Sequence, residues 1–344
     1  MANIVPNFNS KRIFFVSEDL KLQEKVLHFI EEWNNENDFF TANTSGSTGI
    51  PKEIKLDKKI AIAAVKLSNN YFKFEEMHTL GLCLSPETIG GKMQILRALV
   101  YNLNVYIFDN KRNPFENLEK QIDFVTLVPL QMEAILKENP EKFNFISKIL
   151  LGGAQVSSSL KMKLDSITSE CYESYGMTET YSHIAIKNLS AKEKYFSCLD
   201  GVSCKIEKEN LVVFANHLQV DGFKTNDSAN LIDSKHFEIL GRTDFVINSG
   251  GYKFHPEVLE EKLEAEIQHG FFIIGEPDME FGEIVTFYME STYSKDSEKA
   301  INEIFRRKLN RFEIPKKIYF VDKFICTTSG KIDKLKTQKQ LLEH

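Results

Sequence analysis

Thr44-Ser-Gly-Ser-Thr-Gly-Ile-Pro-Lys52 is the stretch of this chain that bears most directly on its fold. A strand-like run, Asp38-Phe-Phe-Thr-Ala42, precedes it, and another, Glu53-Ile-Lys-Leu56, follows it. Glycine permits backbone conformations closed to other residues, so successive N–H groups can turn inward and hold an anion. The sequence therefore predicts a β-turn-β loop for a polyphosphate, with the ligands Thr44, Ser45, Gly46, Ser47, Thr48, Gly49 and Lys52.

A kinase or ATPase P-loop is the competing interpretation of this stretch. That motif, G-x-x-x-x-G-K-[ST], opens a helix. Here Pro51 precedes Lys52 and Glu53 follows it, so the motif is not met. For the loop taken alone, a flexible Gly/Ser turn stays an alternative.

Composition bounds the class of protein. The chain has 344 residues, of which 42% are hydrophobic and 27% are charged, as in soluble globular proteins. Its formal net charge of −6 offers no basic footprint for a nucleic acid. The sequence shows neither an apolar run long enough for a membrane span nor a signal-peptide pattern. Five scattered cysteines without a CxxC pair argue against a zinc site or a disulfide framework and suit a reducing cytoplasm.

Helix-like and strand-like runs alternate after the loop. Helices are predicted over 57–73 and 92–102 and around 131–137, and short apolar strands over 80–84, 105–108, 124–128 and 148–151. Such alternation predicts a mainly parallel α/β sheet. Short strands and turns over 198–239 predict a small β-rich subdomain. Before the loop, Ser17 is predicted to cap a helix with one buried face.

A second unit is predicted to begin at Asp244. Pro256 suits the first position of a helix, and an α+β pattern of about 100 residues follows, enough for a small independent domain. The expected division is therefore an N-terminal α/β domain, 1–243, with the β-rich subdomain, and a small mobile α+β domain, 244–344.

Three further segments carry chemistry. In Tyr172-Glu-Ser-Tyr-Gly-Met-Thr-Glu-Thr180, Tyr175 offers an aromatic face and Glu179 a hard oxygen ligand suited to Mg²⁺. Asp227 and Arg242 could accept from and donate to ribose hydroxyls, although a surface ion pair is the plainer interpretation. The third segment, Thr327-Thr-Ser-Gly-Lys-Ile-Asp333, places Lys331 on a turn of small residues.

Together and in this order, the four segments resemble those of the adenylate-forming enzymes, which include acyl- and aryl-CoA ligases and peptide-synthetase adenylation domains. The resemblance spans about residues 39 to 335. Tyr175-Gly-Met-Thr-Glu-Thr-Tyr-Ser-His-Ile184 looks like the form found in o-succinylbenzoate–CoA ligases of menaquinone synthesis. In Gly91-Lys-Met-Gln-Ile-Leu-Arg97, the arginine is similar to one that those ligases direct toward the acyl pocket; a helix-surface arginine is the alternative.

The resemblance implies a role for each matching residue. Thr48, Glu179 and Lys331 would be catalytic, and Glu179 would hold Mg²⁺. Besides the phosphate loop, ATP would be bound by Gly152, Gly153, Ala154, Tyr175, Gly176, Thr178, Asp227 and Arg242. The acyl substrate would meet Arg97, Thr88, Ser182 and His183, although a hydrogen-bonded structural role is the alternative for His183. Asp244 would be the hinge, and Gly250 and Gly251 would line the CoA tunnel.

Three departures from the family pattern stand out. Only 43 residues precede the phosphate loop, whereas members of the family usually carry a longer segment there, so a shortened N-terminal domain is expected. Asn226 stands where glycine usually precedes the aspartate. Thr88 replaces the usual aromatic residue or histidine before the acyl-site glycine, which puts a gating role there in doubt.

The leading hypothesis is an ATP-dependent ligase that joins a small carboxylic acid to CoA, with o-succinylbenzoate as the acid. Another acyl- or aryl-CoA ligase, or an adenylation enzyme that loads a carrier protein, is the nearest alternative. An inactive nucleotide-binding relative is the alternative of a different class. The expected partners are ATP, Mg²⁺, CoA and the acid, in the cytoplasm, and the resemblance allows a homodimer.

Overall fold

The computed structural model describes residues 12–44, 52–326 and 332–342. Within them, twelve strands form one sheet in the order β1-β5-β4-β6-β7-β8-β9-β10-β14-β13-β12-β11. From β1 to β8 along this order the neighbours are parallel, whereas β9 runs antiparallel to both β8 and β10. The strands are β1 (Ile13–Phe15), β4 (Thr79–Leu82), β5 (Asn104–Ile107), β6 (Ile122–Leu127), β7 (Ile146–Leu151), β8 (Glu170–Met177), β9 (Ser182–Asn188), β10 (Phe196–Cys198), β11 (Ser203–Glu207), β12 (Asn210–Ala215), β13 (Val220–Leu231) and β14 (His236–Arg242).

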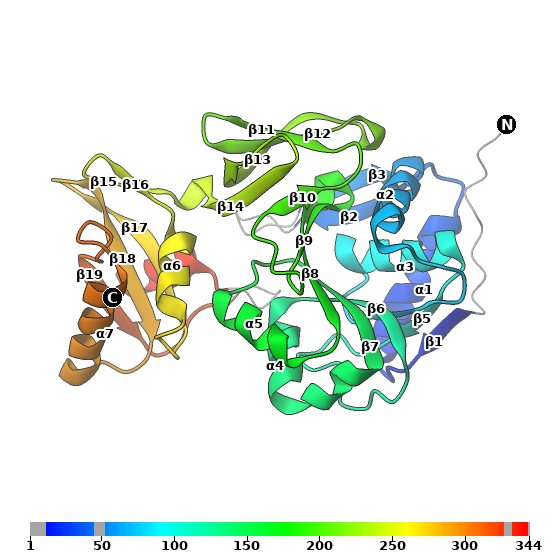
Figure 1. Cartoon of the computed structure of the whole chain (residues 1–344), viewed down its shortest axis with the longest axis horizontal. Coiled ribbons are helices and arrows are strands. Elements are labelled where there is room, and N and C mark those ends of the chain that lie inside the picture. Colours follow the sequence, from blue (N-terminus) through cyan, green and yellow to red (C-terminus); the bar gives the residue numbers. More distant parts are fainter. Residues whose placement is uncertain (1–11, 45–51, 327–331, 343–344) are drawn as a thin grey trace. The chain divides into compact units, whose positions relative to one another are not determined.

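Helices cover both faces of the parallel part of this sheet (Figure 1). Because side chains alternate across a strand, neighbouring residues enter different layers. Val125 packs with α4 and α5 in one cluster, whereas Phe124 and Tyr172 face Phe72 of α2. This arrangement confirms the predicted α/β class. The helices of this region are α1 (Leu20–Asn34), α2 (Lys58–Phe72), α3 (Ile89–Tyr101), α4 (Pro129–Glu138) and α5 (Ser158–Lys163).

Two local features differ from expectation. The β-rich stretch continues the edge of the large sheet, because β10 pairs with both β9 and β14. Helix α1 is capped by Asp19, whose carboxylate accepts from the N–H groups of Lys21 and Leu22, and not by Ser17. Ser17 instead donates to Asp109, in the turn after β5, because it lies too far before the first helical turn to cap it.

Two paired antiparallel strands flank the predicted phosphate loop. Strand β2 (Phe39–Thr44) pairs with β3 (Lys52–Asp57) over six residues, from Phe39 opposite Asp57 to Thr44 opposite Lys52. The predicted strand-turn-strand order is therefore confirmed on both sides of residues 45–51, which lie outside the described residues.

Residues Ile239–His344, together with Ile206–Leu211 and Lys224–Asn230, form a compact unit separate from the rest. Its sheet has the order β16-β15-β18-β17, and β19 pairs in parallel with β18. Helices α6 and α7 contribute to the core on one face, and Leu341 of α8 packs on the other. The elements are β15 (Ile247–Ser249), β16 (Tyr252–Phe254), α6 (Pro256–Glu264), β17 (Phe271–Asp278), β18 (Gly282–Glu290), α7 (Lys295–Lys308), β19 (Lys317–Val321) and α8 (Lys334–Leu342).

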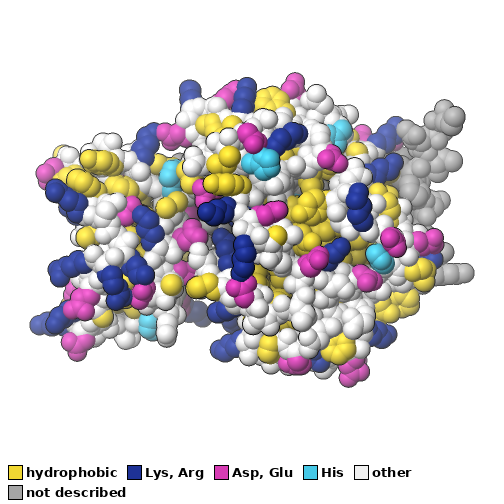
Figure 2. All heavy atoms as spheres, in the orientation of Figure 1, with side chains coloured by type: hydrophobic (Ala, Val, Ile, Leu, Met, Phe, Trp, Pro, Cys, Tyr) yellow, Lys and Arg dark blue, Asp and Glu magenta, His cyan; other side chains and the backbone are white. Residues whose placement is uncertain are grey.

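The distribution of charged side chains and the lengths of the helices agree with the mixed composition of the sequence. Figure 2 shows acidic and basic side chains intermixed over the visible face. Within residues 12–44, 52–326 and 332–342, no helix is both long and apolar enough to cross a bilayer.

Candidate functional site

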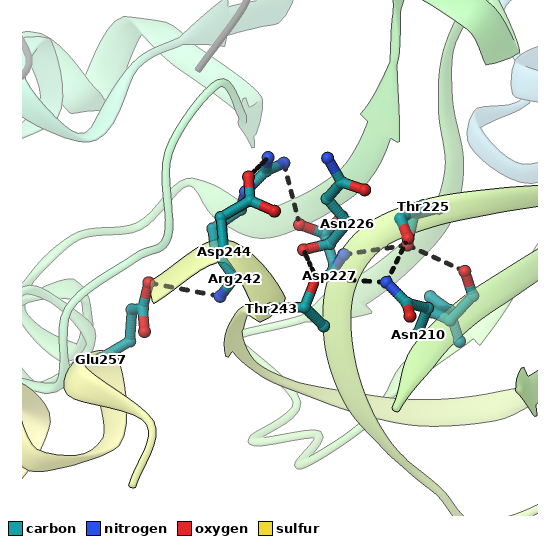
Figure 3. Close-up of polar contacts among 9 residues, drawn as sticks. Asn210, Thr225, Asn226, Asp227, Arg242, Thr243, Asp244 and Glu257 are labelled. Carbon is teal, nitrogen blue, oxygen red and sulfur yellow. Dashed lines mark hydrogen bonds and ion pairs between the residues drawn. The ribbon is translucent and has the colours of Figure 1, made fainter. Parts of the chain in front are cut away.

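Asp227 and Arg242 come together from two strands of the sheet (Figure 3). Arg242 Nη1 lies 3.5 Å from Asp227 Oδ1, and Nη2 lies 2.6 Å from Asp244 Oδ2. About a third of the Arg242 side chain and a fifth of the Asp227 side chain are exposed (33% and 18%). A carboxylate that accepts and a guanidinium that donates, held side by side and open to solvent, can bind the two hydroxyls of a ribose. The geometry fits both that role and a plain ion pair.

A hydrogen-bond network that the sequence did not predict supports this pair. Asn210 Nδ2 donates to the carbonyl of Thr225 at 2.8 Å and to Thr243 Oγ1 at 3.2 Å. Thr243 Oγ1 in turn donates to the carbonyl of Asn226 at 3.1 Å (Figure 3). The network ties the residues before Asp227 to the residue after Arg242. Its members are single polar residues on separate segments, which no sequence motif connects.

The Tyr175 segment belongs to β8, and its backbone lies very close to that of the paired strand β9. A Cβ atom on Gly176 would collide with the backbone of Ser182 and His183, so only glycine fits there. The register of β8 and β9 shifts at this point, between Tyr175 and Gly176. The Tyr175 ring packs 5.2 Å from that of Phe237, which fixes its plane. The aromatic face predicted from sequence is therefore held in place by packing.

A short 3₁₀ turn, η4 (Thr178–Thr180), carries Glu179 out of β8. Thr178 is buried, whereas Glu179 is half-buried, so the carboxylate of Glu179 remains partly accessible. Thr180 Oγ1 donates to the carbonyls of Met177 at 3.2 Å and Ser182 at 2.8 Å, which closes the turn. Ser182, predicted for the acyl site, has φ +89° in this turn. The turn therefore offers the carboxylate of Glu179 as one possible ligand for Mg²⁺. The other ligands of the ion would be phosphate oxygens and water, as is common for Mg²⁺.

The hydroxyl of Tyr181 links this turn to the phosphate hairpin. It accepts a hydrogen bond from the N–H of Asp57, the last residue of β3, at 3.0 Å. Lys52 opens the same strand opposite Thr44. The predicted metal ligand and the two ends of the predicted phosphate loop thus belong to neighbouring pieces of one unit. Ser45, Gly46, Ser47, Thr48 and Gly49 lie outside the described residues, so their roles stay predictions.

The predicted adenine loop leaves the carboxyl end of β7. Gly152 donates its N–H to the carbonyl of Leu127 at 3.1 Å, and a side chain on Gly152 would meet Ser174 Oγ at 2.6 Å. Gly153 has φ +79°, which favours glycine, and Ala154 is exposed. The loop therefore lies beside β8 just before Tyr175. In parallel α/β sheets, ligands bind at this carboxyl edge.

Arg97 is buried, and the alternative of a helix-surface arginine is wrong. Only 3% of it is exposed. Its guanidinium donates to Gln94 and lies 5.4 Å and 5.3 Å from the ring centres of Phe74 and Phe124. Among the described residues no carboxylate pairs with it and its Nε has no hydrogen-bond partner, while burial lowers its pKa to about 10. A charge buried this deeply calls for an anion.

His183 lies in the electrostatic field of Arg97. Burial, and secondarily the Arg97 charge, lower its pKa to about 3, so the imidazole is neutral near pH 7. Its Nε2 lies 3.1 Å from Ser68 Oγ. The structural alternative for His183, a hydrogen-bonded buried histidine, agrees with this geometry. A proton-accepting role would need a less depressed pKa.

Thr88 takes a different position. It caps helix α3 by accepting from the N–H of Gly91 at 3.2 Å. Arg97 is on the same helix, about 13 Å farther along its axis. Thr88 and Arg97 therefore do not form one cluster.

The hinge and tunnel residues have the conformations that their types predict. Asp244 is in the short turn η6 (Thr243–Phe245), where Arg242 holds its carboxylate. Gly250 and Gly251 have φ +56° and +84° between β15 and β16, as a tight two-residue hairpin requires. A Cβ on Gly251 would meet nothing within 4 Å, so this turn has open space beside it.

Gly330 and Lys331 lie outside the described residues, but both flanks of their loop are placed. Cys326 and Ile332 form an isolated antiparallel bridge. Three residues after Lys331, Lys334 Nζ lies 2.7 Å from Glu260 Oε1 of α6. This ion pair anchors the start of α8, three residues after Lys331 in the sequence.

An open, polar hollow lies in the unit that contains the parallel strands, next to the segments that follow β1 and β5. Its lining includes Glu18, Lys25, Ser85, Asp109 and Lys111 and none of the residues predicted for the site. Among the described residues, no group of three or more acidic, histidine or cysteine side chains is arranged to hold a metal ion.

Comparison with known proteins agrees with the resemblance read from the motifs. The family described as AMP-binding enzyme matches residues 11–211, more than half of the chain. The 2-succinylbenzoate–CoA ligase of Staphylococcus epidermidis is 26% identical over 86% of this chain and 69% of its own length. That of Enterococcus faecalis is 28% identical over 85% of this chain and 67% of its own length.

Solved structures show the same fold. An AMP-forming acyl-CoA synthetase-like protein of Dyadobacter fermentans has a TM-score of 0.61 and 28% identity, covering 94% of this chain and 95% of its own. The O-succinylbenzoate–CoA synthetase of Bacillus subtilis, solved with ATP and magnesium, has a TM-score of 0.75 and 20% identity, covering 87% of this chain and 69% of its own.

Proposed function

This chain belongs to the family of AMP-binding enzymes, and on that premise we propose that it activates o-succinylbenzoate with ATP and transfers it to CoA. It is an AMP-forming acyl-CoA synthetase. The named acid and its place in menaquinone synthesis are proposals.

The chemistry explains the residue types. A carboxylate is a poor electrophile, because oxide would be its leaving group. Attack of the carboxylate oxygen on the α-phosphorus of ATP forms the acyl-AMP and releases pyrophosphate. Attack of the CoA thiolate on the acyl carbon then expels AMP. Negative charge spreads over the phosphate oxygens in the first step, so fixed donors and cations lower its barrier.

In the proposal, each predicted residue takes one of these functions. Tyr175 and the Gly152–Ala154 loop frame the adenine, and Asp227 with Arg242 holds the ribose. Glu179 would hold Mg²⁺, which neutralises phosphate charge when it is bound. Lys52 and the loop before it would bind the β- and γ-phosphates. Lys331 would bridge the carboxylate and the α-phosphate, and Gly250 with Gly251 would admit the pantetheine arm after rotation about Asp244.

The observation that carries the choice of acid is the buried Arg97. An aromatic acid with two carboxylates can expose one to ATP and place the other against this guanidinium, and its ring suits the aromatic walls of Phe74 and Phe124. The second carboxylate would pair with the Arg97 guanidinium, which no carboxylate of the described residues contacts. A simple monocarboxylic acid would leave that charge unpaired.

A panel of carboxylates with ATP, Mg²⁺ and CoA tests the proposal, with pyrophosphate and thioester measured separately. We expect both products with o-succinylbenzoate and much less with benzoate. Arg97→Met should cost about ten- to a hundredfold in kcat/KM for o-succinylbenzoate, the range for a lost charged hydrogen bond, and little for benzoate. Equal losses for both acids would remove Arg97 from the acyl site.

The same panel separates the other candidates. Pyrophosphate without thioester would indicate an enzyme that loads a carrier protein. No turnover with o-succinylbenzoate but turnover with another acid would refute the substrate and leave the class. No turnover with any acid, despite ATP binding, would indicate an inactive relative.

The sequence supports a setting for the proposed reaction. Five scattered cysteines without a CxxC pair suit a reducing cytoplasm. We assign the reaction to that compartment, where a free thiol such as that of CoA persists. A homodimer stays a prediction, which sedimentation of the purified protein would test.

A further inference from the structure

The side chain of Glu257 contacts the backbone just before Asp244. Its Oε1 accepts a hydrogen bond from the N–H of Arg242 at 3.3 Å (Figure 3). Its Oε2 is buried and has no hydrogen-bond partner among the described residues. Burial raises the pKa of this carboxyl, and the nearby charge of Lys334 partly offsets the effect.

The contact leaves no room for a side chain at residue 241 while Glu257 keeps this position. Gly241 has φ +145°, and a Cβ there would collide with the Glu257 carboxylate. The Glu257 carboxylate therefore lies in direct contact with the Gly241–Arg242 peptide. This contact, in addition to the backbone angle, explains why glycine precedes Arg242.

Helix α6 delivers Glu257 to this place. Pro256 occupies the first helical position, where its missing N–H costs nothing, and Glu257 follows in the first turn. A carboxylate is favoured near a helix N-terminus, which offsets part of the cost of burying it. Buried polar atoms without a partner are rare in folded proteins, and such an atom is retained where a contact requires it.

The contact joins two residues that lie on opposite sides of Asp244 in the sequence. Arg242 precedes the hinge residue Asp244, and Glu257 follows it. A rotation of the chain about Asp244 moves residues on its two sides relative to each other. In the proposed rotation about Asp244, the hydrogen bond between Glu257 and Arg242 would be kept in one arrangement and lost in the other.

We propose that Glu257 is a positioning residue that holds the Gly241–Asp244 segment, and with it Arg242, in one of the two arrangements of the catalytic cycle. The proposal rests on the proposed two-step function with its hinge at Asp244. The carboxylate acts on Arg242 through its backbone and does not touch the substrate. Its loss should shift the balance between the two half-reactions without removing either.

Amide hydrogen exchange of a peptide that covers residues 239–246 tests the contact without any substrate. In Glu257→Ala, exchange at Arg242 should rise roughly three- to tenfold, as for one lost hydrogen bond. Glu257→Gln keeps an acceptor oxygen and should stay within about twofold of the unchanged protein. The matched control is Glu209→Ala, which removes an exposed ion pair with Lys253 that also joins the two sides of Asp244 and should have little effect.

The half-reactions give the second readout. One assay follows pyrophosphate release from acid and ATP, and the other follows thioester formation from preformed acyl-AMP and CoA. Glu257→Ala should change the ratio of the two rates by roughly three- to tenfold, and Glu257→Gln should restore it. Urea denaturation of each variant identifies any that merely fails to fold, in which case Glu257→Gln and Glu257→Asp are compared instead.

The possible results distinguish a failure of the proposal for Glu257 from a failure of the proposed enzymatic function. Unchanged exchange at Arg242 in a folded Glu257→Ala protein would overturn the positioning role. An unchanged rate ratio, in a protein whose parent catalyses both steps, would overturn the link to the cycle. If the parent catalyses neither step with any acid, the proposed function fails, while the exchange experiment still decides the contact.

Discussion

Arg242 Nη1 lies 3.5 Å from Asp227 Oδ1, and its second terminal nitrogen lies 2.6 Å from Asp244. One guanidinium thus joins the predicted ribose ligand to the predicted hinge. The same residue receives support from Asn210 through Thr243, and from Glu257 through its own N–H. In the proposed function, Arg242 would therefore couple nucleotide binding to the conformation of the hinge.

Arg242→Ala should raise the KM for ATP about ten- to a hundredfold, the range for one lost charged hydrogen bond. Steady-state pyrophosphate release at varied ATP measures it. Arg307→Ala is the control, because that arginine forms an exposed surface pair with Glu266. A KM that stays the same in Arg242→Ala would support the plain ion-pair interpretation.

Lys331→Ala should separate the two half-reactions. Pyrophosphate release should fall about a hundredfold or more, as for other lost donors to a transition state. Thioester formation from preformed acyl-AMP and CoA should continue, because the proposed function assigns the lysine to the first step alone. Equal losses in both assays would refute a domain rotation that removes Lys331.

Lys334→Met should slow the first half-reaction about tenfold, since its ion pair with Glu260 anchors the helix that follows the Lys331 loop. Small misplacements of a catalytic group are costly in rate. Lys336→Ala, which removes a more exposed pair with Asp333, serves as control. Similar rates in the two variants would show that the anchor does not position Lys331.

His183 should make the fold sensitive to acid. Its pKa is about 3 in the folded chain against an ordinary 6.5, so the unfolded chain binds more protons between these values. Its contribution is present above pH 6.5 and is lost as pH falls toward 3, with a limiting slope of about 1.4 kcal/mol per pH unit. Urea denaturation at several pH values should show a flatter profile for His183→Gln. Parallel profiles would indicate that the pKa of His183 is about the same in the folded and the unfolded chain.

Gly176→Ala should destabilise the first unit by about 2–4 kcal/mol, because its Cβ would meet the backbone of β9. Gly90→Ala is the matched control, since a Cβ there would meet only the movable end of Leu84. Urea denaturation at pH 7 compares the two. A Gly176→Ala protein as stable as the control would mean that the crossing of β8 and β9 can widen.

The local sequence was sufficient for the α/β class and for most elements of the fold. Helix α2 begins after Asp57 and ends at Phe72, close to the predicted 57–73, because caps and apolar periodicity are encoded within a few residues. The hairpin on both sides of the phosphate loop and the Pro256 helix follow for the same reason. The sequence also determined the chemistry of the motifs, since glycine, lysine and carboxylate side chains have few substitutes.

Tertiary structure alone decided which side chains meet. Arg97 is buried because the side of α3 that carries it packs toward Phe74 and Phe124, residues far from it in sequence. Asn210 and Glu257 reach the Asp227–Arg242 pair from separate segments, and no local pattern marks them. Long-range pairing also decided that the strands after Cys198 extend the large sheet. Side-chain chemistry is a local property of the chain, whereas burial and proximity depend on packing between distant segments.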